Sequence, residues 1–348
     1  MKTKNIILII SSFFIVSTIY FFNVSLPSLN NINNISISAD TLTYIKISES
    51  SENISNLLML SANYIGPVII DRITGHSFFN IFIFNWCLLI LSIYLIAKDE
   101  SVNIEIVILF LLINPLILIS TNSLNKEILA IFSAALMLRY FNTNSVVYFL
   151  LSVFFSFLTR WNHSFVFICT VFIIQFIRLT KTKPKHVLFL LLFSISFLYP
   201  IIFSKIFYFA GEIPEQTKKG FGIISILNII QQNFGYFLIF PVKVLFNLVG
   251  NIGRVLSFLG IMNDFNYNDH YNIALLGHQI LFLILLLKIR GNNILFNLNK
   301  AQIFIWIYLI LFCISGAIQY RYYVVLYFII VVLYSKRQTI QLNENDIK

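Results

Sequence analysis

Charged residues are scarce in this chain: Asp, Glu, Lys and Arg together make up 11% of its 348 residues. Hydrophobic residues make up 58%, and 37 residues are phenylalanine. A water-soluble core cannot hide that much apolar surface, so the composition excludes an ordinary soluble domain. Apolar runs of about 15 to 20 residues recur from end to end, and a helix needs roughly 20 residues to cross a bilayer. We therefore predict an all-α fold, a polytopic transmembrane helical bundle, in which 1–348 form a single integral-membrane domain.

Cysteine is rarer still. The three cysteines are an odd number, each lies in an apolar run, and they therefore predict buried apolar side chains rather than a disulfide framework. Three histidines lack a second histidine or an acid at metal-ligand spacing: His76, His270 and His278. No Gly-rich phosphate loop and no Ser-His-Asp arrangement can be found either. We expect no metal, no cofactor and no nucleotide-driven transport.

Ten apolar segments are candidate crossings if some of them tilt or thin the bilayer locally. They are 5–22, 78–97, 102–120, 128–140, 146–158, 165–177, 187–210, 273–287, 301–318 and 322–334. The stretch 211–271 is ambiguous, because Pro241, Lys243 and several other polar or small residues interrupt its apolar part. It forms either an outer-face interfacial or re-entrant segment or additional crossings. The prediction is about 10 spans, within a range of 10 to 12.

The net charge of +10 comes largely from basic residues in short loops between the apolar segments. This distribution indicates orientation in a membrane, whereas binding to nucleic acid needs a continuous basic face. The densest basic run, Lys181, Lys183 and Lys185, is explained by anchoring to anionic lipid. Placing the short basic loops inside puts both termini in the cytoplasm. We expect a multi-pass protein of the bacterial inner membrane.

On this orientation, the outer face collects the unusual polar residues. The first outer loop, 23–77, is predicted to carry a juxtamembrane helix with Asp40 and Tyr44. The other outer-face candidates are Lys126, Glu127, Arg160, His163, Arg254, Gln319, Arg321 and Tyr322. A membrane protein needs polar outer loops, but it does not need carboxylates and guanidinium groups at the ends of its spans.

Some of these residues also have purely structural explanations. Asp40 suits the N-cap of an interfacial helix, and Glu127 suits the positive end of a helix dipole. Arg160 and His163, with Trp161 between them, suit an interfacial girdle. Arg321 is harder to explain in this way, because it lies between two apolar runs separated by barely one helical turn.

A carboxylate close to cationic groups is what glycosyl transfer from a polyprenyl-phosphate carrier requires. The carboxylate accepts a proton from the acceptor hydroxyl, while Arg and Lys stabilise the departing phosphate or diphosphate. Either Asp40 or Glu127 fits the role of base.

Three short motifs carry a resemblance to a known family. They are Asp40 with Tyr44, Asn114-Pro115 followed by Ser120-x5-Lys126-Glu127, and Gln319-x-Arg321-Tyr322. Together they resemble the integral-membrane glycosyltransferases of the GT-C type and the related polymerases of O-antigen or capsule repeat units. The resemblance implies that the first-loop acid is the base and that arginines bind the carrier phosphate. GT-C enzymes commonly have paired acids in the first outer loop, whereas here Asp40 precedes Thr41. They also commonly have a soluble outer domain, and none is found in this sequence. Both departures favour the compact polymerases.

The leading hypothesis is a glycosyltransferase that polymerises undecaprenyl-diphosphate-linked oligosaccharide repeat units for lipopolysaccharide or capsule. Asp40 or Glu127 would be the base, and Arg160, Arg254 and Arg321 would bind the diphosphate. The first alternative is a GT-C transferase that adds one sugar from a polyprenyl-phosphate donor, and the second is a lipid-linked glycan transporter or flippase. The expected partners are the polyprenyl-linked glycan and membrane lipid, with a chain-length regulator or a flippase as a candidate protein partner.

Overall fold

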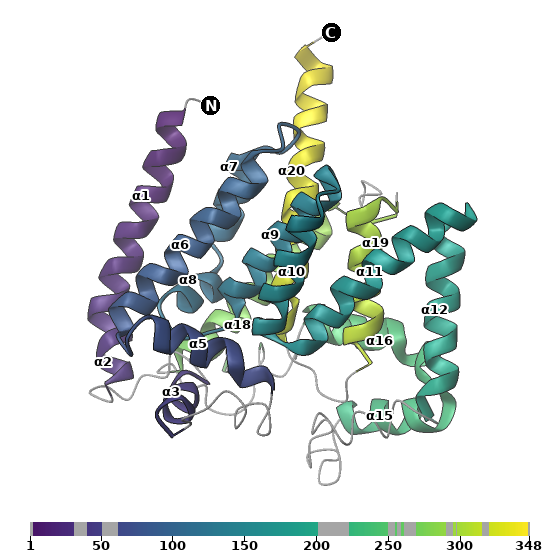
Figure 1. Cartoon of the computed structure of the whole chain (residues 1–348), viewed down its shortest axis with the longest axis horizontal. Coiled ribbons are helices and arrows are strands. Elements are labelled where there is room, and N and C mark those ends of the chain that lie inside the picture. Colours follow the sequence, from purple (N-terminus) through teal and green to yellow (C-terminus); the bar gives the residue numbers. More distant parts are fainter. Residues whose placement is uncertain are drawn as a thin grey trace.

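The computed structural model describes residues 3–30, 40–50, 62–200, 223–249, 269–289, 298–314 and 320–346, with short pieces at 255, 259–260 and 295–296. Every extended regular element in these ranges is a helix (Figure 1). The predicted all-α class is confirmed for this part of the chain.

Helices make up most of the described ranges. Up to residue 121 they are α1 (Thr3–Tyr20), η1 (Phe21–Ser25), α2 (Leu26–Leu29), α3 (Thr41–Ser50), η2 (Ala62–Tyr64), α5 (Ile65–Ile73), α6 (Phe78–Ala97), α7 (Ile104–Leu112) and α8 (Pro115–Thr121). The later ones are α9 (Glu127–Thr143), α10 (Val146–Thr159), α11 (Trp161–Thr180), α12 (Pro184–Leu198), α15 (Ile223–Phe234), α16 (Tyr236–Val249), α18 (His270–Ile289), α19 (Lys300–Phe312), η5 (Tyr320–Tyr323) and α20 (Val324–Asp346).

Four helices in the described ranges are long and apolar enough to cross a membrane: Ile6–Leu29, α6, α11 and α18. The count rises to five if the bent pair α7 and α8 is one span. Helices α10, α12, α16 and α19 are apolar but shorter. By length and composition the chain is thus a helical protein with apolar spans, and the predicted number of about ten is not confirmed.

The predicted crossing 102–120 is not one straight helix, because the chain bends by 76° between α7 and α8, and the pair is a single span only if it crosses as a broken helix. Pro115 causes the break, since proline has no N–H to donate and clashes with the preceding turn. The Asn114 side-chain oxygen caps α8 by accepting from the Leu116 N–H at 3.1 Å, and its amide nitrogen lies 2.8 Å from His278 Nδ1. Gly277 lets α18 approach the break, because a Cβ there would lie 2.5 Å from Pro115 Cγ. A hydropathy average does not register such a break.

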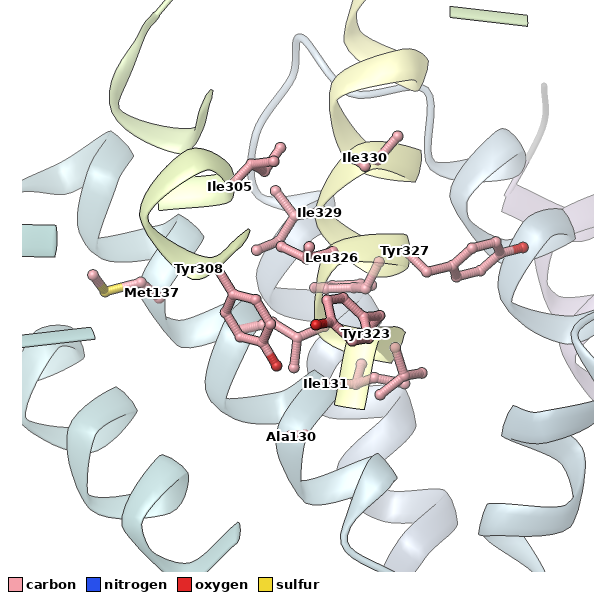
Figure 2. Close-up of a cluster of buried hydrophobic side chains, with 14 of the residues drawn as sticks. Ala130, Ile131, Met137, Ile305, Tyr308, Tyr323, Leu326, Tyr327, Ile329 and Ile330 are labelled. Atoms are coloured by element: carbon pink, nitrogen blue, oxygen red, sulfur yellow. The ribbon is translucent and has the colours of Figure 1, made fainter. Parts of the chain in front are cut away.

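Helices α9 and α20 form the centre of the packed core. In α9, 13 of the 17 residues are buried, which is expected of a helix that is enclosed by other helices. Figure 2 shows Ile131 of α9, Tyr308 of α19 and Leu326 of α20 in one buried cluster. Close packing on all sides fixes where α9 and α20 begin, and both begin at the same end of the molecule.

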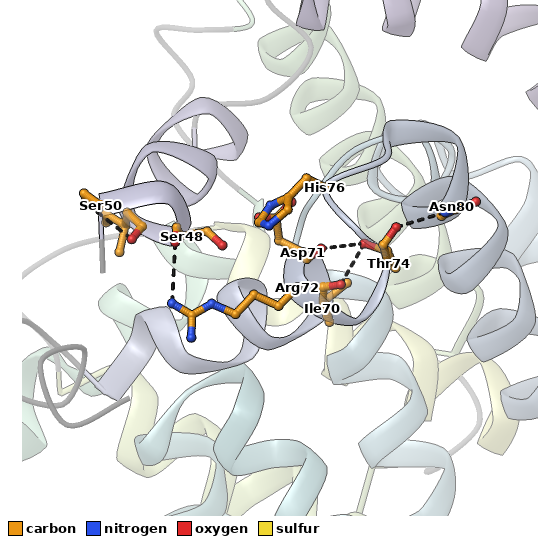
Figure 3. A network of polar contacts seen from close by, with 9 residues as sticks. Ser48, Ser50, Ile70, Asp71, Arg72, Thr74, His76 and Asn80 are labelled. Atoms are coloured by element: carbon orange, nitrogen blue, oxygen red, sulfur yellow. Dashed lines mark hydrogen bonds and ion pairs between the residues drawn. The ribbon is translucent and has the colours of Figure 1, made fainter. Parts of the chain in front are cut away.

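A polar network joins α3 to α5 and the turn that follows it (Figure 3). Arg72 donates to the Ser48 carbonyl at 3.5 Å, and Thr74 donates to the Ile70 carbonyl at 2.8 Å. His76 Nδ1 lies 2.6 Å from the buried carboxylate of Asp71. His76, one of the histidines predicted to be isolated, therefore has an acidic partner. No group of three or more potential metal ligands occurs among the described residues.

The two termini lie at the same end of the long helices, and α3, α5 and α15 lie at the opposite end (Figure 1). The described part of the ambiguous stretch 211–271 forms α15, α16 and the start of α18. Helix α16 packs against α12, α18 and η5, which ties this stretch to the end of the molecule that carries α3.

Candidate functional site

Four segments that are remote in the sequence meet at the end opposite the termini. They are the start of α3, the start of α9, the turn between α10 and α11, and η5 ahead of α20. Helix α5 approaches the end of α10 so closely that a Cβ on Gly66 would lie 1.8 Å from the Leu158 carbonyl oxygen. Only glycine permits this approach, and it holds the first loop against the α10–α11 turn.

Asp40 forms the shortest ionic contact of the site. Its Oδ2 lies 2.5 Å from Arg321 Nη1 and accepts a hydrogen bond from the Tyr44 hydroxyl at 3.1 Å. The Asp40 carbonyl accepts from the Tyr44 backbone N–H at 2.9 Å, so this residue also occupies the capping position of α3. The Arg321 Nη1 group reaches the Tyr271 hydroxyl at 3.4 Å. Asp40 is therefore both at the capping position of α3 and in contact with Arg321 and Tyr44.

The ionic contact weakens Asp40 as a base. Burial acts to raise the pKa of its carboxyl group, but the charge and hydrogen bond of Arg321, with the hydrogen bond of Tyr44, outweigh burial and lower that pKa. Asp40 is thus a stable carboxylate at neutral pH. Its structural effect is to hold the Arg321 guanidinium in place.

Tyr322 lies between two guanidinium groups. The central carbon of Arg160 is 3.4 Å from the centre of the Tyr322 ring, and that of Arg321 is 5.8 Å away. Arg160 has an extended backbone between α10 and α11 and a buried side chain, whereas neighbouring Trp161 is 37% exposed. Trp161 alone therefore fits the interfacial girdle, and Arg160 faces the site. A buried guanidinium and a second one that is 17% exposed, both beside one tyrosine ring, form a site for an anion such as phosphate.

Lys126 adds a third cation. Its Nζ lies 4.9 Å from the centre of the Tyr44 ring and 6.0 Å from that of Tyr64, so the ammonium group is held against aromatic faces. Burial lowers the pKa of the Lys126 amine, and the charges of Arg160 and Arg321 lower it further, to about 7. The charge of Lys126 therefore changes within the physiological pH range.

Glu127 is the second carboxylate, in the first turn of α9 and 4% exposed. Its Oε2 is buried and has no hydrogen-bond partner among the described residues. A small cavity with an empty volume of about 190 Å³ adjoins it and is lined by Lys126, Glu127, Ala130, Thr159, Arg160, His163, Arg321, Tyr322 and Val324. A buried carboxylate oxygen without a donor is rare in folded proteins and indicates a place for a ligand group.

His163 is positioned by a chain of hydrogen bonds. The Tyr308 hydroxyl donates to the Tyr322 carbonyl at 2.6 Å and therefore accepts from His163 Nε2 at 3.2 Å. This fixes the tautomer of His163, in which Nδ1 carries no proton. That nitrogen is buried without a partner in the described part of the chain, so it is able to accept a hydrogen bond from a ligand hydroxyl.

The structure brings most of the predicted site residues together. Those that meet at this end are Asp40, Tyr44, Lys126, Glu127, Arg160, His163, Arg321 and Tyr322. The predicted residues Arg254 and Gln319 lie outside the described residues. Sequence reasoning missed Tyr64 and Tyr271. Tyr271 lies in the first turn of the apolar helix α18, Tyr64 directly precedes α5, and these positions at helix starts are the signal by which both could have been found.

The lowered pKa of Lys126 predicts how affinity for a phosphate-bearing ligand depends on pH. Below about pH 7 the amine is charged and attracts phosphate, and above it the attraction is lost. We expect the dissociation constant of a phosphate-bearing ligand to rise about tenfold between pH 6 and about pH 9. Binding titrations across this range measure it. Lys126→Arg should abolish the pH dependence, because arginine keeps its charge, and an unchanged profile in that variant would contradict the assignment.

The fold and the site define an all-helical protein with apolar spans and a buried cluster of cations and carboxylates at one end. No family model, no curated protein and no solved structure matches the chain.

Proposed function

We propose that this protein is a membrane glycosyltransferase that polymerises undecaprenyl-diphosphate-linked oligosaccharide repeat units on the outer face of the bacterial inner membrane. The observation that supports it most is Glu127, whose buried Oε2 has no hydrogen-bond partner among the described residues and which lines a cavity together with three cations. This reaction needs at least a base that can accept a proton and, beside it, a group that binds phosphate.

The reaction is a displacement at the anomeric carbon of the donor sugar. Glu127 takes the proton from the acceptor hydroxyl, and the oxygen of that hydroxyl bonds to the anomeric carbon. The bond between this carbon and the carrier diphosphate breaks, and the electron pair leaves on the diphosphate. Arg160, Arg321 and Lys126 stabilise that leaving group.

Within this mechanism Asp40 is a positioning residue. Its ion pair orients Arg321, and the lowered pKa of its carboxyl group makes it a weaker base than a carboxylate without such a partner. Between the two bases left open by the sequence, the proposal therefore assigns proton transfer to Glu127.

The membrane arrangement of the proposal follows from the positions of the termini. Both lie at the end opposite the site, so a cytoplasmic location for both places the site on the outer face (Figure 1). The bent pair α7 and α8, the shorter apolar helices α10, α12 and α19, and the helices α9 and α20 supply the further spans of a bundle of about ten. Such short helices cross by local thinning of the bilayer and by packing against longer neighbours.

A transferase that adds one sugar from a polyprenyl-monophosphate donor is the second candidate. The three cations Lys126, Arg160 and Arg321 face the two carboxylates Asp40 and Glu127, which leaves a surplus of one positive charge. A sugar phosphodiester carries one negative charge and matches that surplus. A diphosphate carries two and needs a further cation.

Purified protein given the two donor classes separates these functions. With diphosphate-linked repeat units and detergent, the proposal expects a ladder of products in steps of one repeat unit, resolved by gel electrophoresis and mass spectrometry. Addition of a single sugar from a monophosphate donor would support the second candidate. No transfer from either donor, by protein that retains its thermal unfolding transition, would overturn both. His76→Gln, which lies in the α3–α5 network outside the site, serves as the matched control.

A further inference from the structure

A second and larger cavity lies far from the candidate site. It has an empty volume of about 660 Å³ and is bounded by the connection between α6 and α7, the last turns of α9, the start of α19 and the middle of α20. Figure 1 places this region toward the end of the molecule that carries both termini. Nothing in the glycosyl-transfer chemistry uses it.

The walls of this cavity are amphipathic. The apolar part is formed by Leu95, Ile96, Val102, Leu138, Phe141, Ala301, Val332 and Leu333. The polar part is formed by Asp99, Arg139, Asn142, Asn299, Lys300 and Lys336. Three cations and one carboxylate therefore share a cavity whose other walls are hydrocarbon.

The single carboxylate is already engaged. Asp99 Oδ2 lies 2.6 Å from Lys336 Nζ and accepts a hydrogen bond from the Asn142 amide at 2.8 Å. Burial acts to raise the pKa of Asp99, but the hydrogen bond and charge of Lys336, with the hydrogen bonds of Ser101, outweigh burial and lower that pKa, so Asp99 stays ionised and remains paired with Lys336. Among the residues that line this cavity, no carboxylate is left to pair with Arg139 or Lys300.

Arg139 and Lys300 contact neutral oxygens. Lys300 Nζ donates to the Phe141 carbonyl at 3.1 Å and to the Asn144 side-chain oxygen at 2.6 Å. Arg139 donates from Nη1 to the Lys98 carbonyl at 3.4 Å, and its Nε is buried without a partner in the described part of the chain. Lys300 also opens α19, where a positive charge is unfavourable and an anion is favourable.

We propose that this cavity binds an anionic phospholipid, with its phosphate between Arg139 and Lys300 and the upper part of an acyl chain against the apolar walls. Basic groups above hydrocarbon at the end of a helical bundle match both parts of such a lipid. A soluble phosphate would use the cations but leave the apolar walls exposed to water, so the lipid is the better fit. This inference does not depend on the proposed glycosyl transfer.

Lipid retention by the full-length protein tests the proposal. Purified protein in detergent is incubated with phosphatidylglycerol or phosphatidylcholine, and bound lipid is counted by native mass spectrometry. We expect one tightly held phosphatidylglycerol and no comparable phosphatidylcholine. The double variant Arg139→Gln/Lys300→Gln should bind phosphatidylglycerol about 30-fold more weakly, since each cation near a membrane surface contributes about 1 kcal/mol, or about fivefold.

Controls distinguish this site from general attraction to basic residues. Arg178→Gln removes an exposed cation of α11 and should leave retention unchanged. If the double variant loses its unfolding transition, Lys300→Gln alone should weaken binding about fivefold. Equal retention of the two lipids, equal loss in Arg178→Gln, or displacement of the lipid by inorganic phosphate at equal concentration would overturn the proposal.

Discussion

Replacing Glu127 with glutamine is expected to reduce the rate of glycosyl transfer by about a thousandfold without a comparable change in KM. Glutamine has nearly the same shape as glutamate but cannot accept the proton of the acceptor hydroxyl, and removal of a general base typically costs 10²- to 10⁴-fold. The Oε2 atom has no hydrogen-bond partner among the described residues, so the substitution breaks no contact of that atom. Initial rates at saturating donor measure the effect, and thermal unfolding in detergent shows that the variant is folded.

The matched control for this variant is Glu105→Gln. Glu105 also lies in the first turn of a helix, α7, but at the end of the molecule that carries the termini (Figure 1). Both substitutions remove a favourable interaction with a helix dipole, worth about 0.3 to 1 kcal/mol, and only Glu127→Gln removes the proposed base. A Glu127→Gln enzyme with nearly the parental rate would show that Glu127 is a dipole partner only and would return the role of base to Asp40.

The class of the fold was predictable because the solvent dictates it. A chain that faces hydrocarbon must satisfy its backbone hydrogen bonds internally, so long apolar runs predict helices whatever their side chains are. The number of crossings was less predictable. The bend at Pro115 interrupts an apolar run that hydropathy treats as continuous, and the buried helix α9 is apolar because it contacts other helices. Hydropathy does not distinguish protein contact from lipid contact.

Part of the candidate site was predictable from the order of the segments. If apolar segments alternate in direction, the loops after every second segment lie on one face, and this places Asp40, Glu127, Arg160 and Arg321 together. The pairing within that set was not predictable. The Asp40–Arg321 contact depends on how α3 packs against η5, and the orphaned oxygen of Glu127 depends on a cavity, which no local pattern in the sequence encodes.

Replacing Arg321 with glutamine is expected to lower both stability and activity, and the two effects can be separated. The variant leaves Asp40 as a largely buried carboxylate without its cation, which should cost about 2 kcal/mol in the free energy of unfolding. It also removes one of the two guanidinium groups beside Tyr322, which should reduce kcat/KM at least about a hundredfold. Chemical unfolding in detergent and steady-state rates measure the two quantities independently.

The double variant Asp40→Asn/Arg321→Gln separates a structural role from a role in binding the leaving group. It removes both charges of the ion pair, so no carboxylate is left at residue 40 without the Arg321 cation. Most of the unfolding free energy that Arg321→Gln loses should therefore return. Activity should not return, because the phosphate still lacks its guanidinium. Recovery of activity together with stability would show that Arg321 serves only as the partner of Asp40.

His76→Gln is the control outside the site. It breaks a contact of similar length, that between His76 and Asp71, and should leave kcat/KM at the parental value. A loss of activity in that variant would mean that any disturbance of the first loop inactivates the enzyme, and the effect of Arg321→Gln could then not be assigned to the leaving group.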